Sequence, residues 1–541
     1  MILTPSQRLA VTRGFQPGRI LSIQSGPGCG KSLCIAKRIE FMLNRGVAPE
    51  EIIVLSMTNR AVNSLKKTIS NSFGSRVDDL VIKTFHSFAS MIVDGHQATY
   101  FPNRPPNSVM DDSNWRSFAR FFGAKYHALE KAVDEVNHGS PIESVAEINS
   151  IPVAKLKETV KYLEDNGIVR YSGLITSAMK LMDKSGDNLP LANAKVLVID
   201  EFQDMHPKLL QFIKKIALYG TPKHITLAGD KNQCIYEFLM SYPTITEDFI
   251  KELGFPSEEV VLKETFRLTP QILKEANSII RTDIQSAKAT GLEIMKQEDL
   301  CTDIVELIAL SGGLLRFSDL IVLVRTNKEV DDISQTLTEK YGIKCNKYNG
   351  QDWVNSELHI FLDVLHILRR SYGSDFALLL MFERLGMKKN ELKDLFVAYK
   401  QWNKSNENKL EEFLRMNLKN EKEKFAEFLD CVQAERYELD TPVSIMGSLG
   451  RITQKFNLLP WSSKLQENLN SFFLSLEYSY MNYSKDPTST FIEYFLSHYH
   501  EAEPILEDNS VNISTVHKAK GLEFPVVFIP SRRGFSSRLL N

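Results

Sequence analysis

The chain has 541 residues, of which 43% are hydrophobic and 24% charged, and its formal net charge is −2. This length exceeds one hydrophobic core and predicts three or four folding units. The near-zero charge provides no global basic field and argues against a bulk electrostatic binder of nucleic acid, so any such site must be a local groove. No apolar run approaches the roughly 18 residues of a membrane span, and no secretory or arginine-rich leader is seen at the N-terminus. The six cysteines form no CxxC pair and no zinc spacing, which indicates a reducing compartment and no structural metal.

The first strong signal is a glycine-rich segment between a predicted strand, 20–23, and a helix-compatible stretch, 33–43. Backbone N–H groups at such a helix N-terminus hold phosphate oxygens. Lys31 would reach the β- and γ-phosphates, and the Ser32 hydroxyl would bind Mg²⁺. The segment is a close variant of the phosphate-binding loop and consists of Ser25, Gly26, Pro27, Gly28, Cys29, Gly30, Lys31 and Ser32. It predicts that the chain binds a nucleotide.

Strand and helix signals along the chain predict two α/β sheets, each interrupted by a helical insertion. Continuous apolar runs are typical of parallel strands covered on both faces. Such runs occur at 20–23, 52–55, 80–83, 195–199 and 225–228, with 260–262 as a further candidate, and again at 320–324, 511–515 and 526–529. Two long stretches, 93–185 and 370–505, lack strand signals and are predicted to be helical. We interpret the charged part of the second stretch, 406–440, as a solvated helix surface.

Two acidic residues follow the predicted strand at 195–199. An aspartate at the end of a buried strand suits Mg²⁺ coordination, and a following glutamate can accept a proton from an attacking water. Asp200 is therefore the predicted metal ligand and Glu201 the predicted general base. The next predicted strand leads to Asp230 and then to Gln233, which could sense a γ-phosphate. From spacing alone, a surface turn residue is an equally good interpretation of Gln233.

Taken in order, these segments resemble the motifs of superfamily 1 DNA helicases of the UvrD/Rep type. The matching segments are Leu3–Gln7 (the adenine-reading Q motif), Ser25–Ser32 (the phosphate loop), Ser56–Ala61 and Thr84–Phe88 (DNA-side motifs), Asp200–Asp204 (the Mg²⁺ and base motif), Gly229–Tyr236 (the coupling motif), Glu264–Arg267 (motif IV) and Ser514–Phe524 (motif V). The ordered series covers the whole chain, which makes a chance match improbable.

The resemblance implies two RecA-like P-loop motor domains with parallel sheets, each carrying a helical insertion. We expect domain 1A in 1–92 and 186–265, insertion 1B in 93–185, domain 2A in 266–370 and 506–541, and insertion 2B in 371–505. It also implies an enzyme that uses ATP and Mg²⁺ to move 3′ to 5′ on single-stranded DNA and to unwind duplex DNA. Such an enzyme serves replication, repair or recombination, and we expect a monomer or a weakly self-associating protein.

The resemblance further implies a role for individual residues. Lys31, Ser32 and Asp200 would hold phosphate and Mg²⁺, Glu201 would activate water, and Gln233 and Arg267 would register the γ-phosphate. The adenine would lie against Gln7 and Phe266, and Glu523 of motif V would lie beside the nucleotide. The expected DNA-side residues are Met57, Thr58, Asn59, Thr84, His86, Tyr236, Phe238 and His517.

The sequence departs from the family pattern at several positions. Met57 stands where an aromatic residue is usual, Phe238 replaces a tryptophan, and Leu239 replaces an arginine. The sequence ends at Asn541 without motif VI, which carries a second γ-phosphate arginine. An arginine finger increases the rate of hydrolysis by a factor of about 10³–10⁵. One alternative is therefore a truncated or degenerate homologue that binds nucleotide and DNA without efficient hydrolysis.

Two other functional classes compete with a helicase. A small-molecule kinase could use the same phosphate loop, but it leaves the second sheet and motif V unexplained. A nuclease fusion is disfavoured because no acidic cluster follows motif V. The segment 531–540 has three arginines and no acid, a composition typical of organellar targeting peptides, although a basic tail that contacts solvent or nucleic acid is the simpler interpretation. We predict mitochondrial localisation, with the nucleus or cytoplasm as alternatives.

Overall fold

In the computed structural model the chain falls, by its internal contacts, into two compact units. The first comprises Met1–Val109, Asp134–Pro141 and Leu163–Met295, and the second comprises Met110–Val133, Ile142–Tyr162 and Lys296–Asn541. The structure describes residues 3–73, 79–102, 108–110, 115, 118–119, 125–137, 140–165, 168–170, 173–235, 241–295, 299–348, 353, 357–370, 374–402, 409–418, 423–437, 439–459, 463–484, 490–499 and 509–530.

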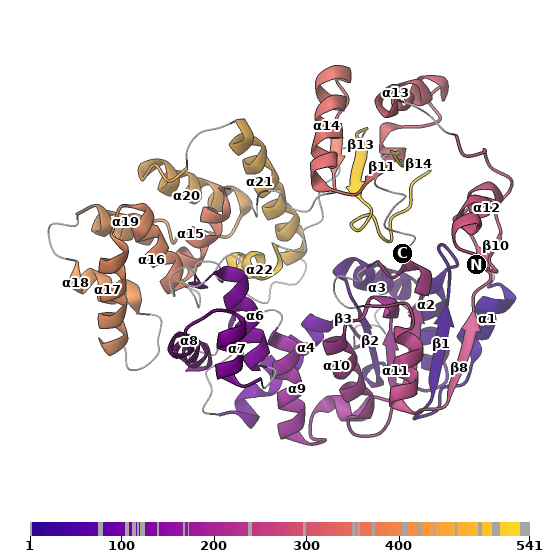
Figure 1. Cartoon of the computed structure of the whole chain (residues 1–541), viewed down its shortest axis with the longest axis horizontal. Helices are drawn as coiled ribbons and strands as arrows, with labels where there is room; N and C mark the ends of the chain where they lie inside the picture. The colour runs from indigo at the N-terminus through magenta and orange to yellow at the C-terminus, as the bar shows by residue number, and fades with distance from the viewer. Residues whose placement is uncertain are drawn as a thin grey trace. The chain divides into compact units, whose positions relative to one another are not determined.

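The first unit is built on a six-stranded parallel sheet (Figure 1). Its strands are β1 (Ile20–Gln24), β2 (Ile52–Ser56), β3 (Val81–Thr84), β6 (Val196–Ile199), β7 (His224–Gly229) and β8 (Ser257–Val261). Their order across the sheet is β3-β2-β6-β7-β1-β8. The apolar runs predicted these strands closely, except that β8 begins at Ser257 rather than at 260. The reason is that β8 lies at the sheet edge, where its first three residues are exposed and give no apolar signal.

Two helical layers cover this sheet. One face, which includes Leu197 and Leu227, packs with α4 (Phe85–Tyr100), α9 (Leu174–Ser185), α10 (Pro207–Leu218) and α11 (Ile245–Leu253). The opposite face, which includes Val54 and Val198, packs with α1 (Pro5–Thr12), α2 (Lys31–Leu43) and α3 (Asn59–Phe73). Neighbouring residues of each strand enter opposite cores because strand side chains alternate. Both faces of the sheet are therefore covered by helices.

A buried arginine fastens α1 and β7 to α2. Arg38 of α2 is 0% exposed, and its guanidinium donates to the Thr226 hydroxyl of β7 at 3.1 Å. It also donates to main-chain carbonyl oxygens at the C-terminal end of α1, those of Ala10, Val11, Arg13 and Gly14. Helix ends leave carbonyl groups without an intrahelical partner, so this single side chain satisfies the end of α1 and fixes its position on the sheet.

The second unit contains a four-stranded parallel sheet of order β12-β13-β11-β14. Its strands are β11 (Leu320–Val324), β12 (Cys345–Lys347), β13 (Val511–Thr515) and β14 (Val526–Phe528). Val322 and Ile513 form its core with Ile304 of α13 (Leu300–Leu310) and Val330 of α14 (Asn327–Tyr341). The predicted strands at 320–324 and 511–515 are confirmed, and the α/β class with parallel sheets is confirmed for both units.

Between β12 and β13 the described residues are mainly helical. The helices are α15 (His359–Arg369), α16 (Ser374–Arg384), α17 (Lys389–Trp402), α18 (Leu410–Asn417), α19 (Glu423–Ala434), α20 (Pro442–Lys455), α21 (Ser463–Tyr483) and α22 (Phe491–His498). The described part of 406–440 is not only a solvated surface, because Phe413 and Phe428 are buried. The charges of this stretch cover one face of the helices while the other face packs inward.

The region 93–185 is helical in most of its described residues. It contains α6 (Tyr126–Asn137), α7 (Ile142–Ile148) and α8 (Val153–Asp165), together with the end of α4 and all of α9. Two short strands, β4 (Ser108–Met110) and β5 (Ile168–Arg170), pair with each other and were not predicted, since three residues are too few for a periodic signal. None of the helices in the described ranges combines the length and apolar character that a bilayer-spanning segment needs.

The contacts of residues 266–295 differ from the predicted division of the chain. That division begins domain 2A at Phe266, but this stretch makes its contacts within the first unit. β9 (Glu264–Thr265) pairs in parallel with β10 (Gln285–Ser286), and α12 (Pro270–Ile279) connects them. Residues 110–133 and 142–162, expected in insertion 1B, group with the second unit. The four-part domain division stays a prediction.

Candidate nucleotide-binding site

The phosphate loop lies at the carboxyl end of β1, directly before α2. Gly28 and Gly30 have φ angles of 72° and 79°, in the left-handed region that favours glycine. Gly30 is the N-cap of α2 and supplies no side-chain cap. The first N–H groups of α2 therefore point out of the helix end, where phosphate oxygens bind.

The Lys31 ammonium lies close to both acidic side chains, the predicted metal ligand Asp200 and the predicted general base Glu201. Its Nζ is 2.7 Å from Glu201 Oε1 and 3.4 Å from Asp200 Oδ1. Burial opposes the charge of Lys31, but Asp200 and Glu201 outweigh burial and raise the pKa of the ammonium. Burial raises the pKa of Asp200 even though Lys31 is close, so the loss of water is the larger effect there. Phosphate oxygens that bound Lys31, as predicted, would compete with Glu201 for the same ammonium.

Glu201 has an unusual backbone conformation for a residue with a side chain. Its φ and ψ angles are 53° and 44°, in the left-handed region, which costs a non-glycine residue about 1–2 kcal/mol. Such conformations persist where the surroundings hold them. The surroundings here are Lys31, the side-chain amide of Gln203, which donates to Glu201 Oε2 at 2.6 Å, and Asp200 Oδ1, which accepts the Glu201 main-chain N–H at 2.9 Å.

The turn after β7 brings Gln233 to the same edge of the sheet. The Gln233 amide donates to Asp230 Oδ2 at 2.8 Å, and the Asn232 N–H donates to Asp230 Oδ1 at 3.0 Å. These bonds shape η6 (Lys231–Gln233). Burial raises the pKa of Asp230, which is 4% exposed. Since β7 lies between β6 and β1, Gln233 follows the strand that separates the phosphate loop from the carboxylates.

Residues of motif IV lie directly on the phosphate loop. The Thr265 hydroxyl donates to the Pro27 carbonyl oxygen at 2.7 Å, and the Phe266 N–H donates to the Gly28 carbonyl oxygen at 2.9 Å. A Cβ atom on Gly28 would lie 2.2 Å from the Cβ of Arg267. The structure therefore brings Arg267 beside the loop that carries Lys31, and Phe266 is 47% exposed.

Gln7 also binds the phosphate loop, through its side-chain amide. Gln7 Nε2 donates to the Cys29 carbonyl oxygen at 3.0 Å, and Gln7 Oε1 accepts the Thr4 N–H at 3.1 Å. The Ser6 hydroxyl donates to Glu264 Oε2 at 2.6 Å, which ties α1 to β9. Glu264 was not predicted as an anchor, because nothing in a linear motif indicates a partner so far along the chain. The adenine-reading role of Gln7 stays a prediction.

The described DNA-side candidates of the first unit lie at or directly after the carboxyl ends of the neighbouring strands β2 and β3. Met57 packs against the core, and the Thr84 hydroxyl accepts the Ser87 N–H as the N-cap of α4. Burial, with His206 and Lys208 adding to it, lowers the pKa of His86 to about 4, so this imidazole is neutral at pH 7. Thr58 precedes α3, which begins at Asn59.

The remaining predicted residues are placed differently. His517 and Glu523 belong to the second unit and follow β13. Tyr236 and Phe238 lie outside the described residues, as does the arginine-containing tail. The structure thus gathers the predicted ATP residues of the first unit and leaves the DNA-side prediction for these positions untested.

The residues predicted to hold Mg²⁺ offer oxygen atoms only. Ser32 lies in the first turn of α2, and Asp200 follows β6. Hard oxygen ligands suit Mg²⁺, which keeps several waters and takes few protein ligands. Across the part of the chain that the structure describes, no group of three or more His, Cys, Asp or Glu side chains is arranged around a metal position. The donor set fits a cation that arrives with nucleotide phosphates.

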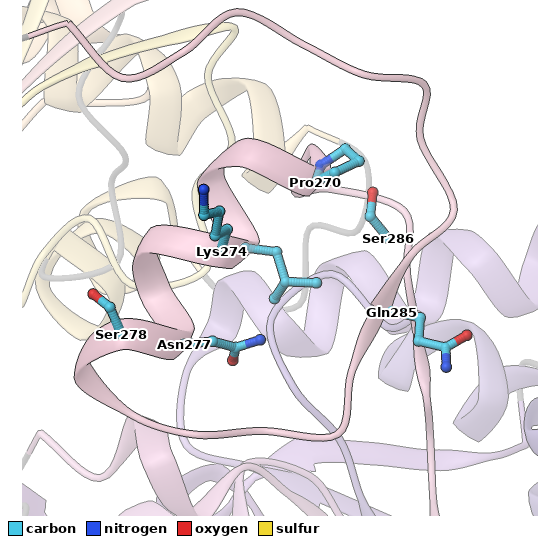
Figure 2. A pocket seen from close by; sticks show the side chains of 7 residues that line it. Pro270, Lys274, Asn277, Ser278, Gln285 and Ser286 are labelled. Carbon is cyan, nitrogen blue, oxygen red and sulfur yellow. The ribbon is translucent and has the colours of Figure 1, made fainter.

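A separate hollow of about 650 Å³ lies between α12 and the segment of β10 (Figure 2). Its polar lining includes Lys274 and Asn277 of α12 and Gln285 of β10. Leu273 and Pro270 supply apolar surface. Its described lining contains none of the residues predicted for nucleotide or DNA, so it is distinct from the site at the phosphate loop.

The chain matches two family models over nearly its whole length. Residues 3–254 match the UvrD/REP helicase N-terminal domain, and residues 260–534 match the UvrD-like helicase C-terminal domain. The first match ends just before β8 and the second begins within that strand, a few residues before the predicted end of the first motor domain at 265.

Several similar proteins are described as ATP-dependent DNA helicases. The mitochondrial ATP-dependent DNA helicase HMI1 of Saccharomyces cerevisiae is 26% identical, with 97% of this chain and 85% of that protein covered. The ATP-dependent DNA helicase srs2 of Schizosaccharomyces pombe is 24% identical over 98% and 67%, and PcrA of Staphylococcus aureus is 22% identical over 94% and 75%. A crystal structure of Pif1 helicase from Candida albicans aligns at 14% identity over 63% of this chain and 55% of that chain, with a TM-score of 0.28.

Proposed function

The chain belongs to the UvrD/Rep family of ATP-dependent DNA helicases, and we propose that it moves 3′ to 5′ along single-stranded DNA and separates duplex strands as it moves. The observation that carries the proposal is the cluster at the phosphate loop. There Lys31 lies 2.7 Å from Glu201 and 3.4 Å from Asp200, beside a helix N-terminus open to phosphate. A cation, two carboxylates and a helix N-terminus are the groups that phosphoryl transfer to water requires.

The residues of the cluster divide the work of hydrolysis. Lys31 and the N–H groups of the loop bind the β- and γ-phosphates. Glu201 takes a proton from the attacking water, whose oxygen forms a bond to the γ-phosphorus while the bond to the bridging β–γ oxygen breaks. The products are ADP and inorganic phosphate. Mg²⁺, held by Ser32 and Asp200, supplies positive charge to the phosphate oxygens when it is bound.

Motif IV and the Q motif supply the nucleotide contacts around this centre. We propose that the exposed ring of Phe266 stacks on adenine, that Gln7 reads the base edge, and that Arg267 contacts the γ-phosphate. The support is that all three residues contact, or lie directly beside, the phosphate loop. The Gln233 amide next to Asp230 is proposed to register the γ-phosphate. Glu523 is proposed for the nucleotide on the family resemblance alone.

The DNA track is proposed from the motif residues that follow strand ends. Base stacking on side chains contributes about 1–3 kcal/mol per base and tolerates any sequence, as translocation requires. The residues proposed to contact single-stranded DNA are Met57, Thr58, Asn59, Thr84, His86, Tyr236, Phe238 and His517. Since His86 is neutral at pH 7, we propose that it acts through hydrogen bonding and packing.

We further propose that the protein is mitochondrial, that it acts as a monomer or self-associates weakly, and that it serves DNA replication, repair or recombination. The similar yeast protein described as mitochondrial supports the first of these. Fractionation of cells that express the tagged protein tests the compartment. Recovery in the nuclear or cytosolic fraction alone would contradict it.

The experiment for the proposed activity compares two duplexes that differ only in the polarity of their single-stranded tail. We expect ATP hydrolysis to be stimulated by single-stranded DNA and the 3′-tailed duplex to be unwound faster than the 5′-tailed one. Hydrolysis that DNA does not stimulate, together with two intact duplexes, would contradict the motor function. Nucleotide and DNA binding without hydrolysis would instead indicate a binding module.

A further inference from the structure

We propose that Gln203 is a positioning residue that fixes the general base Glu201 and links it to the Asp230 turn. The proposal rests on the proposed function, because it assigns a role within ATP hydrolysis. Gln203 belongs to η5 (Phe202–Asp204) and is 1% exposed. Its amide uses both ends: Nε2 donates to Glu201 Oε2 at 2.6 Å, and Oε1 accepts the Asp230 N–H at 3.0 Å.

The two carboxylate oxygens of Glu201 have different partners. Oε1 lies 2.7 Å from the Lys31 ammonium, whereas Oε2 accepts from Gln203. A triphosphate that draws Lys31 away therefore leaves the bond from Gln203 in place. This remaining bond holds Glu201 in its left-handed conformation at the moment when it has to face a water molecule. Lys31 thus pairs with Glu201 before phosphate binds, and Gln203 orients Glu201 both before and after phosphate binds.

The other end of the amide connects the base to the γ-phosphate sensor. The Asp230 carboxylate accepts from Gln233, and the Asp230 N–H donates to Gln203. A shift of Gln233 toward a phosphate moves the Asp230 turn, and the Gln203 amide transmits that movement to Glu201. The path consists of three consecutive hydrogen bonds between described groups.

The backbone makes room for this amide at one position. A Cβ atom on Gly229 would lie 2.7 Å from the side-chain oxygen Oε1 of Gln203 and 3.4 Å from the main-chain nitrogen of Gln203. Any side chain at Gly229 would therefore push the amide out of its place. The close approach, the burial and the two satisfied ends together indicate a fixed link rather than a surface amide.

The test uses two substitutions of Gln203 in the full chain. Gln203→Asn keeps the amide but is too short to span both partners. Gln203→Glu has the same shape and still accepts from Asp230, but it cannot donate while ionised and places a second carboxylate next to Glu201. Gln97→Asn and Gln97→Glu are the matched controls, since Gln97 is a buried glutamine on α4 of the same unit and outside the site.

We expect Gln203→Asn to lower the kcat of basal ATP hydrolysis by about 10- to 100-fold, since displacement of a catalytic group by about 1 Å has effects of this size. The affinity for a fluorescent ATP analogue should stay within about threefold, because the phosphate-binding groups are untouched. The Gln97 variants should hydrolyse ATP as the unaltered protein does. Unchanged kcat in Gln203→Asn would overturn the proposal.

The pH profile separates positioning from a general loss of packing. In Gln203→Glu the neighbouring carboxylates share a proton, which raises the pKa of the base. The acid limb of the kcat profile should therefore move to higher pH, so that activity lost at pH 7 returns in part as the pH rises. A uniform loss at every pH would argue that the residue is merely structural.

The double variant Glu201→Gln with Gln203→Asn completes the test. If Gln203 acts through Glu201, adding Gln203→Asn to Glu201→Gln should change kcat less than about twofold. Two losses that multiply would overturn the link. All of these comparisons use hydrolysis without DNA, so a failure of DNA stimulation would remove the motor function and leave the assignment of Gln203 standing.

Discussion

Arg38 Nη2 and His224 Nε2 lie 2.9 Å apart in the interior of the first unit. His224 Nδ1 lies 3.3 Å from the Gln16 carbonyl oxygen, so Nδ1 carries the hydrogen and Nε2 accepts from Arg38. Burial, with the Arg38 charge adding to it, lowers the pKa of His224 to about 3. Burial also lowers the pKa of Arg38 to about 10, so at pH 7 the arginine is charged and the histidine is neutral.

This pair predicts acid destabilisation of the first unit. The unfolded histidine titrates near pH 6.5, and the folded one near 3, so between these values the unfolded chain binds one more proton. The stabilisation is complete above about pH 6.5 and is lost progressively as the pH falls. His224→Gln keeps an acceptor for Arg38 but has no group that titrates. Between pH 4 and 6 this variant should therefore take up about one proton fewer on unfolding than the unaltered protein. Urea midpoints from circular dichroism at several pH values measure it.

His127→Gln is the control for this titration, because the side chain of His127 is 89% exposed. It should leave the dependence of the midpoint on pH unchanged. An identical pH dependence in His224→Gln and the unaltered protein would contradict the assignment.

The phosphate loop makes a prediction for Lys31. Lys31→Ala removes the ammonium that binds phosphate and should lower DNA-stimulated hydrolysis by at least about 100-fold. It also leaves Asp200 and Glu201 without their cation, so the melting temperature should fall while the circular dichroism spectrum is retained. Lys37→Ala, on the same helix and paired with Glu40 at 2.6 Å, should hydrolyse ATP normally. Full activity in Lys31→Ala would refute the site.

Glu201→Gln separates binding from turnover. The amide has nearly the same shape as the carboxylate but cannot take a proton from water, so kcat should fall by about 10²- to 10⁴-fold. Binding of a fluorescent ATP analogue should persist, because Lys31 and the loop remain. Single-turnover hydrolysis is the measurement, and an unaltered rate constant would exclude Glu201 as the base.

The hydroxyl of Thr265 predicts how motif IV supports nucleotide binding. Thr265→Val keeps the shape and loses the bond to the Pro27 carbonyl oxygen, which costs about 1 kcal/mol. The KM for ATP should rise by about three- to tenfold while kcat changes little. Thr282→Val is the control, since the Thr282 hydroxyl donates to Asn277 Oδ1 at 2.7 Å within the same segment. Equal KM values for the two variants would contradict this role.

Phe238→Ala tests the DNA track, for which the evidence is the motif alone. Loss of one stacked base costs about 1–3 kcal/mol, so affinity for single-stranded oligonucleotides should fall by about 5- to 100-fold. ATP binding should be unaffected. Fluorescence anisotropy with a labelled oligonucleotide measures the effect, and equal DNA affinity and ATPase stimulation would show that Phe238 does not contact DNA.

The features that were predicted correctly from the sequence are those that depend on residues close together in the chain. The apolar runs indicated the strands of both sheets, because strands buried on both faces need no polar alternation. The phosphate loop, Asp200 and Glu201 were predicted because each follows a strand end, and strand ends of a parallel sheet meet at one edge. For the same reason Gln233 was placed near them.

The features that were not predicted depend on distant partners. Glu264 receives hydrogen bonds from α1, Gln203 reaches Asp230, and Arg38 gathers the carbonyl groups at the end of another helix. No spacing within a motif indicates such contacts, since they arise only when the strand order is known. The left-handed backbone of Glu201 was likewise hidden, because the residue type alone disfavours it.

The position of β7 has a further consequence for how the proposed ATP site is connected to the proposed DNA contacts. This strand separates the strand of the phosphate loop from the strand of the carboxylates, so the turn that follows it lies between the two halves of the proposed ATP site. In the sequence, Gln233 is followed closely by Tyr236 and Phe238, which are proposed to contact DNA. The proposed γ-phosphate sensor and the proposed DNA contacts are thus close neighbours in the sequence, and we expect ATP hydrolysis and DNA binding to be coupled through this short segment.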